Sequence, residues 1–425
     1  MPPIRFIHAA DLHLDAAFSG LSRDIPADFA ERLRTATFTA FRRLLDLCER
    51  ESPDFLLLAG DVYNQEDASV SAQLALRDGF RRLESLSIPV FLVHGNHDPL
   101  ASRLRSVRWP GNVTVFGELP DAVPVFRKGE GTPLAIIHGA SHASGRETRN
   151  LAALFRRTEA CGLHVGLLHA TPGDADGVAR YAPFSPEDLK ASGMDYWALG
   201  HIHDRREVCR EPLAAYPGCT QGLHINEPGE KGCLLVTAEA RPDGGYAVRT
   251  SFRPLGPAVW KTLDMDLGGA ASLDELENRL RTGLDRAAAE VWSGCEMLLV
   301  RLRLQGRTEL DGLLRKGTTC AELADRLRED GSGVPRIWIK DIDVATRPCV
   351  ERGALLERED LLGEVFRLSE AARTASGLQA LREGPLAPLF AHARAGKALE
   401  PLTDEELARL LDDAESLCLD LLEND

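Results

Sequence analysis

Short apolar runs alternate with amphipathic stretches along residues 1 to about 240. The runs IRFIHAA, FLLLA, VFLV, HVGLL and YWAL each predict a β-strand, because short uninterrupted apolar segments suit strands that are buried on both faces. Between the first two runs, DFAERLRTATFTAFRRLLDLCERE predicts one helix with a single apolar face, formed by Leu33, Phe41, Leu44, Leu45 and Cys48. This alternation favours an α/β fold.

The pattern changes twice further along the chain. From about 250 to 348, a helical stretch, SLDELENRLRTGLDRAAAEVW, precedes two strand-like runs, MLLVRLRL and RIWIKDIDV, which together predict a small α+β domain. Residues from about 350 onward are mostly helical and acidic. We therefore expect three parts, at 1–245, 250–348 and 350–425, and a chain of 425 residues suits two or three domains.

The last helix carries its own start signal. Thr403 and Glu406 have the spacing of a capping box. The helix then presents one apolar stripe, made of Leu407, Leu410, Leu411, Ala414, Leu417, Cys418 and Leu421. Such a stripe packs either on its own domain or on a partner, and the sequence leaves both possibilities open.

Composition narrows the class of protein. The net charge of −15 argues against a general polyanion binder, but it does not exclude a nuclease, because bound cations reverse the local field. No apolar run reaches the roughly 18 residues of a membrane span, and the N-terminus leads straight into a strand, so we expect no signal peptide. The nine cysteines form no CxxC motif, which is typical of dispersed thiols in a reducing compartment. We expect a cytoplasmic protein.

Seven potential metal ligands follow the five predicted strands. They lie in DLH, GDVYN, GNHD, LLHA and GHIH, and are Asp11, His13, Asp61, Asn96, His169, His201 and His203. Residues at strand ends converge at the rim of a sheet. Oxygen and imidazole ligands without cysteine suit Mn or Fe, with Zn possible. Seven ligands are too many for one ion with open positions, whereas two ions that share a carboxylate would use them all, and such pairs commonly attack phosphate esters.

Other polar residues near these motifs allow simpler interpretations. His8, His94, His138 and His164 lie in or beside apolar strands and are interpreted as buried, hydrogen-bonded histidines. Asp15 and Asp98 are expected to orient a histidine or cap a turn. His142 lies in a polar loop and could contact phosphate. Arg103, Arg105 and Arg108 could meet a DNA backbone or form an exposed helix face.

The order DLH, GD, GNHD, H, GHIH resembles that of the metallophosphoesterase superfamily over residues 4 to about 205. The resemblance implies a sandwich of two mixed β-sheets flanked by helices, with a dinuclear site at one rim. It implies that Asp11, His13, Asp61 and His203 hold one ion. The other ion would be held by Asp61, Asn96, His169 and His201. His97 would be the catalytic histidine that binds no metal.

Three longer segments resemble the SbcD-type DNA repair exonucleases, namely FIHAADLHLD, DYWALGHIH and YPGCTQGLHINEPGEKGCLLV. The part after residue 250 matches the position of that family's capping domain. The resemblance implies a DNA exonuclease that uses two divalent ions, with Mn as first candidate and Fe or Zn as alternatives, and attack by a hydroxide that bridges the ions. Some members have a histidine where this chain has Asn64, which can contact phosphate but cannot act as an acid. The balance of exonuclease and endonuclease activity stays open.

The same resemblance implies partners. Besides DNA, it implies an SMC/ABC-type ATPase and a homodimer, and no association with a membrane. Two other functions remain open, a phosphatase or small-molecule phosphodiesterase of the same fold, and a catalytically quiet subunit of an ATPase complex. The additional domain argues against the first alternative, and the complete set of ligands argues against the second.

Overall fold

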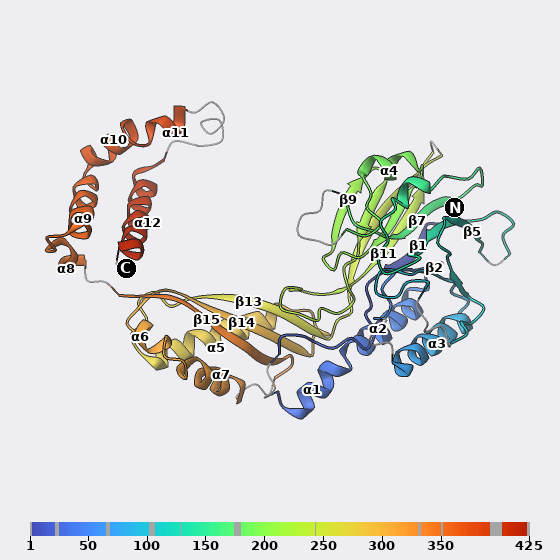
Figure 1. The fold of residues 1–425 in the computed structure, drawn as a ribbon, viewed down its shortest axis with the longest axis horizontal. Coiled ribbons are helices and arrows are strands. Elements are labelled where there is room, and N and C mark those ends of the chain that lie inside the picture. Colours follow the sequence, from blue (N-terminus) through green and yellow to red (C-terminus); the bar gives the residue numbers. More distant parts are fainter. Residues whose placement is uncertain are drawn as a thin grey trace. The chain divides into compact units, whose positions relative to one another are not determined.

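A computed structural model describes residues 2–21, 25–64, 69–101, 107–127, 129–173, 180–242, 244–329, 333–349, 352–391 and 402–422. The chain forms two compact units, and Figure 1 labels many of their helices and strands. The first unit comprises residues 1–266, 273–305 and 313–345, and the second comprises residues 267–272, 306–312 and 346–425.

Two six-stranded sheets lie in the first unit. The first sheet has the order β12-β11-β1-β2-β3-β4, with β1 Ile4–Ala9, β2 Phe55–Ala59, β3 Val90–Val93, β4 Val113–Val115, β11 Gly232–Ala240 and β12 Tyr246–Pro254. Strands β1 to β4 are parallel, and β11 is antiparallel to both of its neighbours. The sheet is therefore mixed, as expected.

The second sheet has the order β5-β6-β7-β8-β10-β9. Its strands are β5 Asp121–Val125, β6 Ala135–Ala140, β7 Leu163–His169, β8 Tyr196–Gly200, β9 Arg206–Arg210 and β10 Leu213–Tyr216. The four central strands are parallel, and each edge strand is antiparallel. All five strands predicted in the first half of the sequence are present, and the predicted sandwich of two mixed sheets is confirmed.

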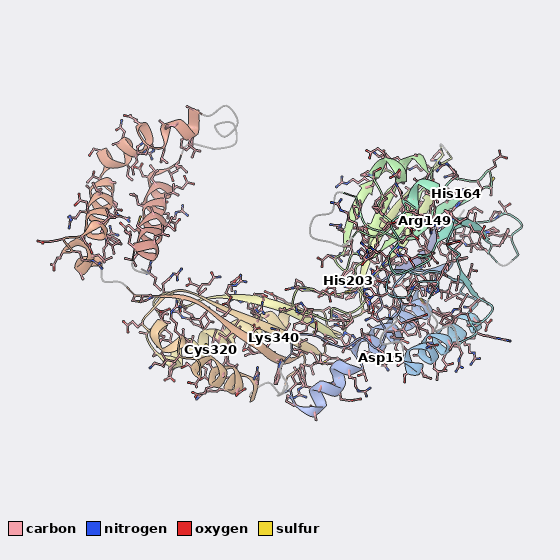
Figure 2. The ribbon with its side chains drawn as sticks, viewed as in Figure 1. Asp15, Arg149, His164, His203, Cys320 and Lys340 are labelled. Atoms are coloured by element: carbon pink, nitrogen blue, oxygen red, sulfur yellow. The ribbon has the colours of Figure 1, made fainter. Side chains whose placement is uncertain are left out.

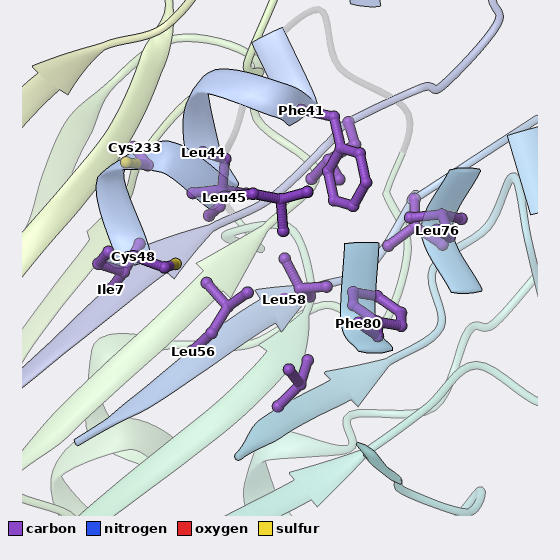
Figure 3. Packing of buried hydrophobic residues seen from close by; sticks show 14 of the residues in the cluster. Ile7, Phe41, Leu44, Leu45, Cys48, Leu56, Leu58, Leu76, Phe80 and Cys233 are labelled. Carbon is purple, nitrogen blue, oxygen red and sulfur yellow. The ribbon is translucent and has the colours of Figure 1, made fainter. Parts of the chain in front are cut away.

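Alternate residues of the central strands face two different cores. Phe55 and Leu57 of β2 join a cluster between the two sheets that also contains Val165 of β7. Leu56 and Leu58 of the same strand face the other way, toward helices α2 Ala36–Glu51 and α3 Val70–Ser85 (Figure 3). Because both faces of β2 are buried, its sequence is uniformly apolar and gives a clear strand signal.

The helix predicted between β1 and β2 is two helices. The helix α1 Ala27–Arg34 ends at Thr35, after which α2 begins. The Thr35 hydroxyl donates to the carbonyl oxygens of Glu31 and Arg32 at 3.1 and 3.3 Å, a local bond that competes with continuous helix. The predicted single face is consequently divided, since Leu33 packs in a different cluster from Phe41 and the residues after it.

A three-stranded sheet follows, in the order β13-β14-β15. It comprises β13 Ala258–Asp266, β14 Met297–Thr308 and β15 Arg336–Pro348, with helices α5 Leu273–Glu290, α6 Asp311–Leu314 and α7 Thr319–Glu329. Trp260, Met297 and Trp338 of this sheet share a buried cluster with Phe29 and Leu33 of α1. The predicted strands and helix are present, while the domain boundaries 1–245, 250–348 and 350–425 stay a prediction.

The second unit is largely helical, with α8 Arg352–Leu356, α9 Leu361–Ala372, α10 Ala375–Glu383, α11 Ala387–Ala391 and α12 Asp404–Leu422. The predicted capping box is present, because the Thr403 amide donates to Glu406 and the Glu406 amide donates to Thr403 Oγ1, at 2.7 and 3.2 Å. The predicted apolar stripe lies on one continuous helix. Leu407 is buried, but Leu410, Leu417 and Leu421 are exposed, so the stripe is only partly covered within the described residues. No helix in the described part of the chain is long and apolar enough to cross a membrane.

Candidate metal centre

The chain segments at one end of the sandwich carry the residues that the sequence singles out. These segments follow β1, β2, β3 and β8, and one further residue, His169, is the last residue of β7. Because these strands run parallel within each sheet, their carboxyl ends lie at a common rim. The structure brings together all seven predicted ligands, namely Asp11, His13, Asp61, Asn96, His169, His201 and His203.

Asp11, His13 and His203 form a first cluster, here called the Asp11 group. Each of them offers one ligand atom, and these atoms lie within 4.8 Å of one another. The Nε2 atoms of His13 and His203 are 3.1 Å apart, and His203 Nε2 lies 3.8 Å from Asp11 Oδ1. Two imidazole nitrogens that face each other beside a buried carboxylate suit a shared cation.

Asp61, His169 and His201 form a second cluster of the same kind, here called the Asp61 group. The Asn96 Oδ1 atom joins it, at 3.0 Å from His169 Nε2 and 3.1 Å from His201 Nδ1. Asp61 Oδ2 lies 3.3 Å from His169 Nε2 and 3.9 Å from His13 Nε2. The Asp61 carboxylate thus lies between the two groups, which is where a bridging ligand has to be.

The backbone of the site is strained. Asp11, His13, Asp61 and His201 have φ values of 51°, 40°, 49° and 104°, in the left-handed region that non-glycine residues rarely occupy. Hydrogen bonds between the loops hold this conformation, since the Asp11 amide donates to the Gly60 carbonyl oxygen and the His13 amide to the Asp61 carbonyl oxygen, both at 3.1 Å. Such strain is typical of functional sites, where the surrounding structure maintains it.

Asp98 ties the loops after β2 and β3 together. Its fully buried carboxylate accepts hydrogen bonds from the backbone amides of Asp61, Val62 and Gly95, at 3.2, 3.0 and 2.7 Å. The interpretation of Asp98 as a turn-capping residue is confirmed. Gly95 allows the two loops to approach closely, because a Cβ atom at that position would lie 2.2 Å from Asp61 Oδ1.

Glu227 orients His203, which is labelled in Figure 2, and the sequence analysis missed it. His203 Nδ1 donates to Glu227 Oε1 at 2.5 Å, and the Leu223 amide donates to Oε2 at 2.6 Å. Burial by itself lowers the pKa of His203, but the Glu227 carboxylate raises it above its ordinary value. Cys219 lies beside His203 but is a poor candidate ligand. Burial raises the pKa of the Cys219 thiol well above its usual range, and a protonated thiol binds metal poorly. The signal for Glu227 was its place in the polar block QGLHINEPGEKG.

The pKa values of the two aspartates are shifted in opposite directions. Burial raises the pKa of Asp11. Burial also favours protonation of Asp61, but His169 outweighs it and holds the pKa of Asp61 below its ordinary value. The pKa of His169 is raised to about 9 although burial lowers it, because Asp61 stabilises the imidazolium. A divalent cation can replace the protons that these buried groups otherwise share. The donor set, with carboxylates, imidazoles and one amide oxygen, therefore fits divalent ions of intermediate hardness.

His97 differs from the other histidines of the rim because its side chain is exposed. Its backbone amide donates to Asp61 Oδ1 at 2.9 Å, and its ring centroid lies 5.2 Å from that of His13. Among the described residues, His97 belongs to neither group of potential ligands. Its imidazole therefore lies beside the donor atoms and faces solvent.

The two predicted substrate contacts lie in different surroundings. Asn64 Oδ1 is 2.6 Å from His13 Nδ1, so the amide orients that imidazole. His142 is fully buried, and its Nε2 lies 2.6 Å from the His169 carbonyl oxygen. Burial lowers the pKa of His142 to about 4. A phosphate contact by Asn64 or His142 stays a prediction, and the contacts described here instead favour supporting roles for both.

Comparison with known proteins adds independent findings. Residues 4–205 match the family described as "Calcineurin-like phosphoesterase", and residues 260–347 match "Metallophosphoesterase YhaO, middle domain". The chain is 34% identical over 388 residues to the "Uncharacterized metallophosphoesterase YhaO" of Bacillus subtilis (strain 168), which covers 90% of this chain and 91% of the relative.

More distant relatives are called "DNA double-strand break repair protein Mre11". The protein from Aeropyrum pernix is 28% identical over 320 residues, covering 68% of this chain and 69% of the relative. The protein from Haloferax volcanii is 24% identical over 390 residues, covering 87% of this chain and 78% of the relative.

Proposed function

Because the chain belongs to the calcineurin-like metallophosphoesterase superfamily, we propose that it is a metal-dependent hydrolase that cleaves the phosphodiester bonds of DNA. In this proposal the protein is a DNA repair exonuclease of the SbcD type and acts in the cytoplasm. The observation that carries the proposal is the convergence of the Asp11 group and the Asp61 group around the Asp61 carboxylate, with the exposed His97 imidazole beside them.

We assign the ligands of the two ions as the motifs suggest. One divalent ion would be held by Asp11, His13, Asp61 and His203, and the other by Asp61, Asn96, His169 and His201. Manganese is our first candidate, with iron or zinc as alternatives. When bound, two such ions polarise the oxygens of a phosphoryl group and lower the pKa of water.

The chain itself supplies orientation and proton transfer. Glu227, Asn64 and the Ala59 carbonyl oxygen each lie next to the Nδ1 atom of one histidine, so the Nε2 atom of that histidine is directed into the site. The exposed His97 imidazole is accessible to a phosphodiester that arrives from solvent. We propose that it protonates the leaving oxygen or stabilises the charge that develops on the phosphoryl group.

Two observations support DNA over a small ester as the substrate. The Mre11 relatives are named for repair of DNA double-strand breaks. In addition, the three-stranded sheet packs on α1 within the same compact unit as the metal centre, and a polymeric substrate needs more surface than a single phosphate group does. A monophosphatase has no evident use for this additional domain.

A digestion assay tests the proposal. The metal-loaded protein is incubated with end-labelled linear duplex DNA, single-stranded DNA and bis(p-nitrophenyl) phosphate, with Mn²⁺ present or chelated. We expect shortening of the labelled DNA that requires the metal. Hydrolysis of the small ester without cleavage of either DNA would favour a small-molecule phosphodiesterase, and no hydrolysis of any substrate by protein with full metal content would favour a regulatory subunit.

The proposal includes an SMC/ABC-type ATPase partner and a homodimer. The exposed leucines of α12, Leu410, Leu417 and Leu421, support a docking role for the second unit. Sedimentation analysis of the purified chain tests the dimer, and copurification with the candidate ATPase from the same cells tests the partner. A monomer that does not bind the ATPase would remove this part of the proposal.

A further inference from the structure

Two arginines directly after the last metal motif have no carboxylate partner among the residues that the structure describes. Arg205 and Arg206 are exposed, and neither forms an ion pair within the described part of the chain. The adjacent Asp204 carboxylate is engaged by Lys231 at 2.9 Å. In a chain with a net charge of −15, two guanidinium groups without neutralising partners form a local site for an anion. Of the arginines considered from the sequence, Arg103 and Arg105 lie outside the described residues, and Arg108 is exposed in a segment that is not helical.

The backbone that carries these arginines is fixed to the metal centre. The His203 carbonyl oxygen accepts from the Lys231 ammonium at 3.1 Å and from the Cys219 amide at 3.2 Å. Gly218 packs against the same segment, since a Cβ atom there would lie 2.7 Å from the His203 carbonyl oxygen and 3.1 Å from the Arg205 nitrogen. Two residues span at most about 7 Å. The backbone of Arg205 therefore lies close to the proposed ligand His203 and is held in place by these contacts.

Aromatic rings position both guanidinium groups. The Arg205 guanidinium lies over the Phe252 ring at 4.0 Å, and the Arg206 guanidinium lies over the Tyr216 ring at 5.5 Å. Stacking occupies one face of each group. The N–H donors lie in the plane of the guanidinium, so they remain available for the in-plane, two-point contact that phosphate oxygens favour.

The location of Phe252 indicates which phosphate would be bound. Phe252 lies in β12, two strands away from β1, whose end carries Asp11. Two strand spacings amount to about 10 Å, and the register places Phe252 level with His8, three residues before Asp11. This separation is well above the roughly 3.4 Å axial rise per nucleotide, so the arginine would meet a phosphate other than the one at the metal centre. A small ester has one phosphate group, and it cannot occupy the metal centre and this position together.

We propose that Arg205 and Arg206 bind the backbone of a DNA strand at a phosphate other than the one that is cleaved, and thereby distinguish polynucleotides from small phosphodiesters. This inference rests on the proposed function. The arginines act on substrate binding and take no part in the chemical step, so their removal should raise the KM for DNA and leave hydrolysis of a small ester unchanged.

The test uses the metal-loaded full chain with the variants Arg205→Ala, Arg206→Ala and the double variant. Initial rates are measured on a labelled oligonucleotide and on bis(p-nitrophenyl) phosphate at about 50 and 200 mM salt. We expect a rise in the KM for DNA of about three- to tenfold per arginine at the lower salt concentration, because each phosphate contact contributes about one unit to the salt slope. Arg205→Lys should restore part of the loss.

Arg210→Ala is the matched control. Arg210 is exposed, lies in the same strand, and is at the opposite end of β9 from Arg206, about 13 Å away at the usual rise per residue. It should leave the KM for DNA nearly unchanged. Equal loss on both substrates, or a KM for DNA unchanged in the double variant, would overturn the inference. Wild-type protein that hydrolyses the small ester but neither binds nor cleaves DNA would overturn the proposed substrate and this inference with it.

Discussion

Replacing Glu227 by glutamine should weaken metal binding in the Asp11 group. The Glu227 carboxylate accepts the Nδ1 proton of His203 at 2.5 Å and is fixed by the Leu223 amide. Glutamine keeps the size of the side chain but removes the charge, so the His203 imidazole becomes less basic and less firmly oriented.

The structure allows the size of the effect to be worked out. A hydrogen bond to a charged group contributes about 1.5–3 kcal/mol. The Glu227 side chain is 20% exposed, so solvent screens part of this contribution. The remainder corresponds to the roughly 10- to 100-fold loss of metal affinity that is typical when a partner of a ligand histidine is removed. The ion held by Asp61, Asn96, His169 and His201 should be retained.

Equilibrium dialysis with metal analysis measures the effect directly. At limiting Mn²⁺, the Glu227→Gln variant should hold about one ion per chain under conditions in which the wild-type protein holds about two. Glu230→Gln is the matched control, because Glu230 lies in the same loop, accepts the Trp292 amide at 2.9 Å, and contacts no proposed ligand. A Glu227→Gln variant that binds two ions with wild-type affinity would refute the reasoning.

Three further predictions follow from the site and the core. Asp61→Ala should lose both ions in metal analysis, because its carboxylate lies between the two groups, and full retention of two ions would exclude bridging. His97→Ala should keep metal and fold but lose turnover by about 10²–10⁴-fold, which steady-state kinetics beside a metal assay would check. The third concerns His138, whose pKa burial lowers to about 4. Because the folded value lies below that of the unfolded chain, His138 contributes stability above about pH 6.5 that is lost as the pH falls toward 4. Chemical denaturation at pH 7 and pH 5 tests this. Between these pH values His138→Phe should lose less free energy of unfolding than the wild-type protein, by on the order of 1–2 kcal/mol. An identical pH dependence in the two proteins would contradict the lowered pKa of His138.

The convergence of the seven motif residues could be predicted because it depends on strand ends alone. Each block follows an apolar run, and parallel strands end at one rim. The interpretation of the other histidines follows from the same pattern. His8 is fully buried and bonded to the Tyr196 hydroxyl at 2.9 Å, and His138 is bonded to His164 at 3.0 Å. His94 is also buried, but among the described residues its Nδ1 atom has no hydrogen-bond partner and lies 3.4 Å from Asp98 Oδ2.

The features that the sequence did not indicate depend on specific polar contacts, either local or between residues far apart in the chain. Glu227 reaches His203 across 24 positions, and no periodicity links the two. The break between α1 and α2 depends on a local hydroxyl bond of Thr35, which a helical pattern of apolar residues does not reveal. The left-handed φ of Asp61 depends on bonds to two other loops. The pattern of apolar residues in a sequence indicates which residues are buried, whereas these features depend on specific polar partners.

The loop that contains Glu227 also connects the three-stranded sheet to the metal centre. Gln221 exchanges two hydrogen bonds with the backbone of Ala258, at 2.9 and 3.1 Å. The Trp260 indole donates to the Gly222 carbonyl oxygen at 3.0 Å. Since Gln221 and Gly222 precede Glu227 in one loop, movement of β13 would be transmitted to the carboxylate that orients His203. The three-stranded sheet is thus placed to support the metal site itself. A change in β13 that lowers metal affinity would reveal this role, whereas a change that raises only the KM for DNA would reveal a role in holding the proposed substrate.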